Sequence, residues 1–411
     1  MSGSAAALAR RPESWRQDAF VAVATVAAGV FGYAFSLVLS RSLGPSGFGE
    51  LSALLAVVVL AGVPGVALQA GIARGIAARP DRDDAPRVLR QSSVVALAVG
   101  ALLLITSPLL KAALDVRSWT SLLLLCAIMV PTTVTYGCLG VLQGRRRFVA
   151  LGSLLVLVQL AKLAGGLIAV VTGTGITGAL LGTAVLTIVV AIGAAIALLP
   201  RRPALRVRFA RRDLTGVRGV FARDAVAMLG VLLLTNLDLV LARHYLPSHQ
   251  AGLYAAGNLV TKVAFWGPSF VSTVSYPRLA RAEERAAALR RGALVLGAFA
   301  GLTAVGALVC APLLPVVVGT AYRSVEPLVW LFAVEGAALA AVLLGVYAGV
   351  AVNDRRLAAL VWVVAFGEAA AVALRWHASM QQVLGVVLCG SAMLVFAAAW
   401  RYRSVLVPLS P

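Results

Sequence analysis

Five ionisable side chains lie inside long apolar stretches of the chain. They are two lysines, Lys162 and Lys262, and three acids, Asp238, Glu335 and Glu368. A charge near the centre of a bilayer costs about 2.5–3.5 kcal/mol on insertion scales, so it persists only where it is paired or faces water or a ligand. These five residues are therefore the first candidates for chemistry.

Each lysine has a polar neighbour on its own helical face. Gln159 precedes Lys162 by three residues and Asn258 precedes Lys262 by four, spacings that place side chains together on a helix. An ammonium group suits an anionic phosphate as a point charge, so we expect both lysines to bind substrate. The alternative is a buried ion pair with one of the acids that only orders the helices.

The buried acids are candidates for carrying a proton or a sodium ion. Asp238 is the first choice because Asn236 supplies further oxygen nearby. Glu335 and Glu368 are the other two candidates. The alternative for each acid is a salt bridge with a lysine or an arginine.

Three arginines are expected at the two mouths of a cavity, where they would meet substrate phosphates. Arg41 and Arg243 occupy equivalent ends of two predicted helices, and Arg74 ends a third. The alternative for these arginines is anchoring at the membrane surface or capping of helix C-termini.

The composition indicates which elements position these residues. Of 411 residues, 61% are hydrophobic and only 13% are charged, which excludes an ordinary soluble protein and predicts an all-α polytopic membrane protein. A membrane-spanning helix needs about 20 apolar residues. The chain divides into twelve such spans, at residues 18–40, 51–72, 91–113, 119–142, 150–172, 175–199, 223–242, 252–276, 292–315, 325–350, 357–374 and 382–400. Three prolines inside them, Pro64, Pro131 and Pro268, are candidates for kinks.

The net charge of +20 mainly reports orientation. With the N-terminus in the cytoplasm, 28 of the 36 lysines and arginines fall in cytoplasmic segments and 6 in outside loops. This asymmetry predicts that both termini are cytoplasmic, and it leaves little reason to expect nucleic-acid binding.

The two halves of the chain repeat. Residues 37–46 (LVLSRSLGPS) align with residues 239–248 (LVLARHYLPS), and Gly49 aligns with Gly252 after one extra residue. Two parallel six-helix repeats are a transporter architecture. We expect an N-terminal tail (1–17), a first lobe (18–199), a basic linker (200–222), a second lobe (223–402) and a C-terminal tail (403–411).

Cysteine and histidine give no sign of a metal site or a disulfide framework. The four cysteines lie in apolar runs, and neither residue type shows ligand spacing. We therefore expect no metal and no cofactor. The apolar stretch after Arg16 lacks a signal-peptidase site, which favours a retained first helix.

Several short motifs follow one another along the chain. They are SRSLGPSGFG at 40–49, NLD at 236–238 with AGLYAA at 251–256, YPRL at 276–279, and VGTAY at 318–322. Together they resemble the MOP (multidrug/oligosaccharidyl-lipid/polysaccharide) exporter superfamily, and within it the Wzx-type polysaccharide biosynthesis flippases. The resemblance implies two six-helix lobes in a V shape around a central cavity. It also implies alternating access that moves a lipid-linked glycan between leaflets.

Three functions follow, in decreasing order of expectation. The first is a flippase for a polyprenyl-diphosphate-linked oligosaccharide in the bacterial cytoplasmic membrane, with glycosyltransferases or a glycan polymerase as pathway partners. The second is a MATE-like ion-coupled drug or metabolite antiporter, which two central lysines disfavour for cationic substrates. The third is a membrane-embedded glycan polymerase or ligase, which the short outside loops disfavour. We expect a transporter and not an enzyme.

Overall fold

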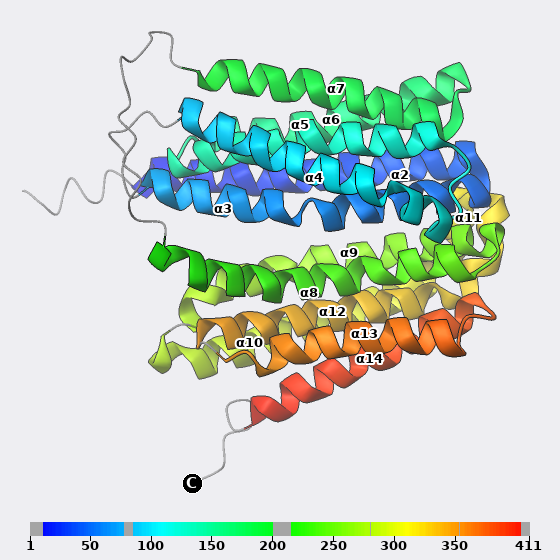
Figure 1. Cartoon of the computed structure of the whole chain (residues 1–411). Helices are drawn as coiled ribbons and strands as arrows, with labels where there is room; N and C mark the ends of the chain where they lie inside the picture. The colour runs from blue at the N-terminus through cyan, green and yellow to red at the C-terminus, as the bar shows by residue number, and fades with distance from the viewer. Residues whose placement is uncertain (1–10, 78–84, 200–214, 280, 353, 404–411) are drawn as a thin grey trace, which may run out of the picture. The chain divides into compact units, whose positions relative to one another are not determined.

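The computed structural model describes all residues except 1–10, 78–84, 200–214, 280, 353 and 404–411. The described residues form α-helices and short 3-10 helices without a strand (Figure 1), which confirms the predicted all-α fold. The first helices are α2 (Arg11–Ala61), α3 (Val63–Ala77), α4 (Ala85–Ala113), α5 (Trp119–Gly144), α6 (Phe148–Thr172) and α7 (Gly175–Leu198). They are followed by α8 (Thr215–Tyr245), α9 (Ser248–Leu279), α10 (Ala282–Cys310), η1 (Ala311–Leu313), α11 (Leu314–Val318), η2 (Thr320–Leu328), α12 (Val329–Ala351), α13 (Arg356–Leu374) and α14 (Met380–Arg401).

Within the described ranges, ten helical segments are long and apolar enough to cross a membrane. The first of them, Phe20–Ala77, has 58 residues, which is about 87 Å of helix against about 30 Å of hydrocarbon. The helix α9, which contains the predicted span 252–276, is not among the ten. The count of twelve crossings and the orientation of the termini stay predictions.

Glycine and proline explain where the long first segment is interrupted. Gly44 has φ 63° and ψ 178°, a conformation that is essentially restricted to glycine. A second interruption falls at Gly62, between α2 and α3, with Pro64 in the first turn of α3, where proline is tolerated. Pro131 and Pro268 lie instead within the continuous helices α5 and α9.

The chain turns tightly between the spans predicted at 150–172 and 175–199. The helix α6 ends at Thr172, Gly173 adopts the left-handed conformation with φ 66°, and α7 begins at Gly175. A left-handed glycine directly after the last helical residue is a common way to end a helix.

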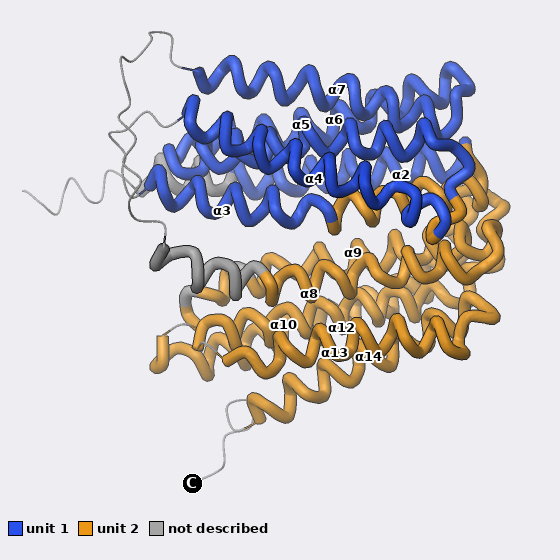
Figure 2. Tube along the Cα trace, in the orientation of Figure 1, with its two compact units in different colours: residues 1–42, 61–112, 116–213 blue, residues 43–60, 113–115, 214–411 orange. Residues whose placement is uncertain are grey.

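The chain forms two compact units (Figure 2). Unit 1 comprises residues 1–42, 61–112 and 116–213, and unit 2 comprises residues 43–60, 113–115 and 214–411. Most of the predicted linker, at 200–214, lies outside the described residues, and its last part belongs to α8. The boundaries of the predicted lobes stay predictions.

Unit 1 is held together by close helix contacts at glycines. A Cβ atom on Gly165 of α6 would lie 2.5 Å from the carbonyl carbon of Gly182 in α7. A Cβ atom on Gly140 of α5 would lie 2.8 Å from the carbonyl oxygen of Gln69 in α3. Small residues let helices approach closely where lipid gives no hydrophobic drive for association, so these positions determine the packing of the unit.

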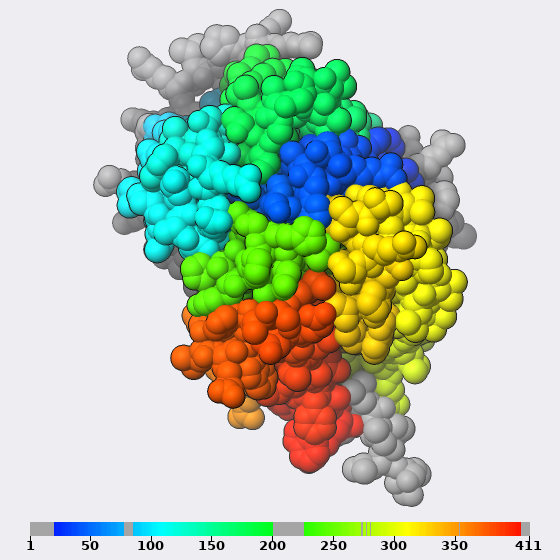
Figure 3. All heavy atoms as spheres, turned by 90° about the vertical axis from the view of Figure 1, so that its right-hand side faces the viewer, coloured from blue at the N-terminus to red at the C-terminus, as the bar shows by residue number. Residues whose placement is uncertain are grey.

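Unit 2 is built around α12. In the segment formed by η2 and α12, 72% of the most apolar stretch is buried inside the protein. In the segment that contains α10, only 11% of the most apolar stretch is buried. The helix α12 packs on α9, α10 and α14, and Gly336 permits the contact with α9, because a Cβ atom there would lie 2.2 Å from the carbonyl oxygen of Thr261. Figure 3 shows one end of this unit, where the yellow residues of η1, α11 and η2 form part of the surface.

The segment 43–60 packs on the start of α9 through two glycines of unit 2. A Cβ atom on Gly252 would lie 1.7 Å from the carbonyl oxygen of Pro45. A Cβ atom on Gly49 would lie 2.8 Å from the backbone nitrogen of Gly252. Backbone therefore touches backbone at this crossing, and a side chain at either position does not fit.

Candidate functional site

The side chain of Asp238 is held by α9. Asp238 lies in α8 and is 1% exposed. Its Oδ2 accepts a hydrogen bond from the Tyr254 hydroxyl at 3.0 Å and another from the Asn258 amide at 2.6 Å. Its Oδ1 accepts none from the described residues. One carboxylate oxygen is therefore occupied by two donors, and the other is left to accept a cation or a proton.

Lys262 lies one turn beyond Asn258 on α9 and is partly exposed. Its ammonium group and the carboxylate of Asp238 attract each other electrostatically. The described part of the chain gives Lys262 no hydrogen bond and no ion pair within 4.0 Å. Asn258, which the sequence places beside Lys262, donates its amide to Asp238 instead.

Glu335 and Glu368 lie in the same unit as Asp238. Glu335 in α12 is 0% exposed. The Thr261 hydroxyl lies 3.2 Å from Glu335 Oε2 and 2.9 Å from the carbonyl oxygen of Phe332, so it donates to one of them at a time. In α13, the Oε1 atom of buried Glu368 would lie 2.0 Å from a Cβ atom on Gly390. Glycine at this position of α14 therefore makes room for the carboxyl group.

The three acids repel one another when ionised. One oxygen of each, Asp238 Oδ1, Glu335 Oε1 and Glu368 Oε1, has no hydrogen-bond donor among the described residues. No group of three or more acidic, histidine or cysteine side chains in the described residues is arranged to hold a metal ion.

Asn236 is bonded to its own helix. Its amide nitrogen donates to the carbonyl oxygen of Leu232 at 2.9 Å and to the Thr235 hydroxyl at 3.0 Å. The described residues show no contact between Asn236 and Asp238. The expected role of Asn236 beside Asp238 stays a prediction.

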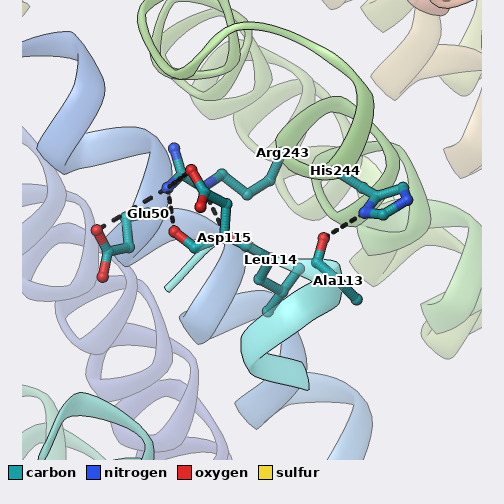
Figure 4. Close-up of polar contacts among 6 residues, drawn as sticks. All are labelled: Glu50, Ala113, Leu114, Asp115, Arg243 and His244. Atoms are coloured by element: carbon teal, nitrogen blue, oxygen red, sulfur yellow. Dashed lines mark hydrogen bonds and ion pairs between the residues drawn. The ribbon is translucent and has the colours of Figure 1, made fainter. Parts of the chain in front are cut away.

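Arg243 is enclosed at the end of α8 (Figure 4). It is 3% exposed, and it donates to the carbonyl oxygens of Leu114 and Asp115, both at 2.8 Å. Its Nη2 also lies 3.9 Å from Glu50 Oε2 and 3.7 Å from Asp115 Oδ2. The guanidinium thus caps the carbonyl groups that follow α4, which is the alternative to phosphate binding that the sequence leaves open.

His244 continues this contact. Its Nδ1 lies 2.6 Å from the carbonyl oxygen of Ala113, and because a carbonyl only accepts, Nδ1 carries the proton. Two consecutive residues of α8 therefore bind three consecutive carbonyl groups, those of residues 113–115, within unit 2.

Lys162 lies in unit 1, in α6. Its ammonium group stands 4.6 Å from the centre of the Phe35 ring, within the range of a cation–π interaction. One turn earlier, the Gln159 amide nitrogen lies 3.4 Å from the carbonyl oxygen of Ala28. The polar stripe predicted on this helix therefore faces α2, and Lys162 is partly exposed there.

The two remaining arginines lie at helix ends of unit 1 and are exposed. Arg41 lies in α2, shortly before the interruption at Gly44, and Arg74 lies in the last turn of α3. Their predicted role at the mouths of a cavity stays a prediction.

Four polar residues of these clusters were missed in the sequence. They are Tyr254, Thr261, Glu50 and Asp115. A signal was present for the first two, because Tyr254, Asn258, Thr261 and Lys262 follow one another at spacings of three, four or one residue on α9. Glu50 and Asp115 are far from Arg243 in the sequence and belong to no such pattern.

Comparisons with known proteins agree with this architecture. The family described as "Polysaccharide biosynthesis protein" matches residues 14–283, more than half of the chain. No curated protein sequence matches the chain.

Solved structures share the fold at low sequence identity. A multidrug resistance MATE family transporter of the MOP superfamily, in its inward-facing conformation, aligns with a TM-score of 0.74 and 14% identity over 93% of this chain and 96% of that one. The lipid II flippase MurJ aligns with a TM-score of 0.68 and 11% identity over 93% and 87%. A MOP superfamily transporter from Pyrococcus furiosus aligns with a TM-score of 0.60 and 14% identity over 95% of each chain. The chain therefore belongs to the polysaccharide biosynthesis protein family, a membrane transporter family of the MOP superfamily.

Proposed function

We propose that this protein flips a polyprenyl-diphosphate-linked oligosaccharide from the inner to the outer leaflet of the bacterial cytoplasmic membrane, for cell-surface polysaccharide biosynthesis. The observation that carries the proposal is one partly exposed lysine inside a long helix of each unit, Lys162 in α6 and Lys262 in α9. Each ammonium group is suited to a diphosphate. The family match to polysaccharide biosynthesis proteins supports a glycan substrate.

The proposed mechanism is alternating access. The diphosphate binds to the lysines while the site is open to the cytoplasm, and it leaves after the site has opened to the outside. The lipid tail stays in the bilayer throughout. Arg41 and Arg74 are the further cations proposed to meet phosphate on entry or exit, whereas the contacts of Arg243 favour its capping role.

Ion coupling through Asp238 is part of the proposal. Asp238 offers one oxygen without a donor among the described residues, in a site that is closed to bulk water. A proton or a sodium ion bound there would neutralise its charge. If flipping in proteoliposomes were insensitive to imposed proton and sodium gradients, this part of the proposal would be abandoned.

The direct test uses the purified protein in liposomes that contain a fluorescent polyprenyl-diphosphate oligosaccharide. Flipping is measured as the fraction of dye that a membrane-impermeant reductant quenches. We expect Lys162→Ala and Lys262→Ala to abolish flipping. Lys111→Ala is the matched control because Lys111 ends α4, where it contacts the Trp119 ring. Full flipping by both central lysine variants would exclude the diphosphate role.

A MATE-like antiporter is the second candidate. Three buried acids in unit 2 favour it, and so does the shared fold. Uptake of a cationic dye by the same liposomes distinguishes the two functions, and we expect none.

A further inference from the structure

The helix α9 presents three polar side chains to the region of Asp238 at four-residue intervals. Tyr254 and Asn258 both donate to Asp238 Oδ2. Lys262 follows after one further turn, about 6 Å along the helix axis, and its charge attracts the carboxylate. One turn of α9 thus binds the acid, and the next turn carries Lys262, which attracts the acid without an ion pair within 4.0 Å among the described residues.

The contacts leave only one oxygen for that cation. Asp238 Oδ2 already accepts two hydrogen bonds, and Oδ1 accepts none from the described residues. Lys262 and an external cation would both be attracted to this remaining oxygen. Lys262 also differs from its partner in exposure, because the lysine is partly exposed whereas Asp238 is buried. Lys262 is attracted to Asp238 by charge and makes no hydrogen bond with the described residues. Its ammonium group can therefore turn to another anion.

We propose that Lys262 exchanges between Asp238 and the substrate diphosphate, so that a cation bound at Asp238 Oδ1 releases Lys262 to bind the diphosphate. This inference rests on the proposed function and adds the direction of coupling. Cation and substrate strengthen each other's binding, and they are bound together in the loaded state. Binding linkage is reciprocal and amounts typically to about 5- to 150-fold between coupled sites. An antiporter of the MATE type would need the opposite sign, in which cation and substrate exclude each other.

The test measures binding to the full-length protein in detergent, with farnesyl diphosphate as the anionic probe. Titrations are made with and without sodium at constant pH, and at two pH values without sodium, so that the two possible cations are separated. Wild-type protein should bind the probe about tenfold more tightly when the effective cation is present. Asp238→Asn should bind tightly without any cation, and Lys262→Gln should bind weakly whatever the cation. Lys111→Gln should behave as wild type.

A second measurement omits the diphosphate altogether. Radioactive sodium binding, or proton uptake if pH is the effective variable, should be about tenfold tighter in Lys262→Gln than in wild type, because the internal competitor is gone. A lysine that only binds diphosphate would leave this affinity unchanged, and that result would overturn the inference. The inference would also be overturned if the affinity of wild type for farnesyl diphosphate were unchanged or lowered by both sodium and protons. Failure of wild type to bind the probe in any condition would overturn the proposed function as well.

Discussion

Replacing Arg243 tests whether this buried cation is structural. Arg243→Met keeps an unbranched apolar chain over the first part of the side chain but removes the charge and every donor. The Glu50 carboxylate, 3.9 Å from Nη2, attracts Arg243 by about 4 kcal/mol at an effective dielectric constant of about 20. Each of the two hydrogen bonds to Leu114 and Asp115 adds about 1.5–3 kcal/mol.

The desolvation of both charges offsets much of this attraction. Breaking a buried ion pair by removing one partner costs about 3–5 kcal/mol, and this is the loss of folding free energy that we expect. The assay is unfolding of the purified protein in mixed micelles of a mild detergent and sodium dodecyl sulfate. Glu50→Gln should lower the folding free energy less in the Arg243→Met variant than in wild type, because the Glu50 carboxylate of that variant already lacks its guanidinium partner.

The outcome that refutes the structural role is specific. If Arg243→Met unfolds at the same detergent ratio as wild type and binds farnesyl diphosphate more weakly, then Arg243 serves the substrate and the capping contacts contribute nothing measurable.

Three further predictions follow from close contacts and from one partly buried acid. Gly252→Ala should prevent accumulation of folded protein, because its Cβ would meet the Pro45 carbonyl. The control Gly29→Ala, whose Cβ would meet no neighbouring atom within 4 Å, should express normally. Equal yields of the two variants would contradict the close contact between the segment 43–60 and α9. Gly390→Ala should reduce flipping and thermal stability, because its Cβ would meet Glu368 Oε1, and Glu368→Ala should rescue the stability but not the flipping. Partial burial opposes ionisation of Asp354, but the backbone N–H of Arg356 and the Arg401 guanidinium outweigh it and hold the pKa of Asp354 below its usual value. This stabilisation is present above the unfolded pKa of about 3.9 and is lost as pH falls through the lower folded pKa. Asp354→Asn should therefore unfold at a lower temperature than wild type by a constant interval between about pH 5 and 8, and a difference that grew on acidification would contradict this sign.

The sequence predicted the helices well because their determinants are local. Apolar runs of membrane length are hard to mistake, and the turn at Gly173 follows from the only clustered glycines and threonines between two such runs. The five ionisable residues were also placed correctly within helices, although only the three acids among them are buried. Each of these conclusions depends on neighbouring residues alone.

The partners of those charges were much harder to predict. Spacing on one helix suggested that Asn258 lies with Lys262, but the approach of α8 to α9 gives the amide a better acceptor in Asp238. Arg243 meets residues about 129 positions earlier in the chain, and no periodicity relates them. Asp115 has φ 45°, in the left-handed region that aspartate adopts more readily than most residues with a side chain, and no periodic pattern in the sequence marks this position.

The contact between Gly49 and Gly252 has a consequence for the origin of the fold. These glycines occupy equivalent positions in the two predicted sequence repeats, and in unit 2 their backbones touch each other. A surface that binds its own copy is the defining property of a two-fold symmetric dimer. Duplication and fusion of a gene for a six-helix dimer would leave this pairing, with one ancestral glycine now represented twice. The two glycines are now encoded separately but lie at one backbone contact, so a bulky residue at Gly49 should be as damaging as one at Gly252.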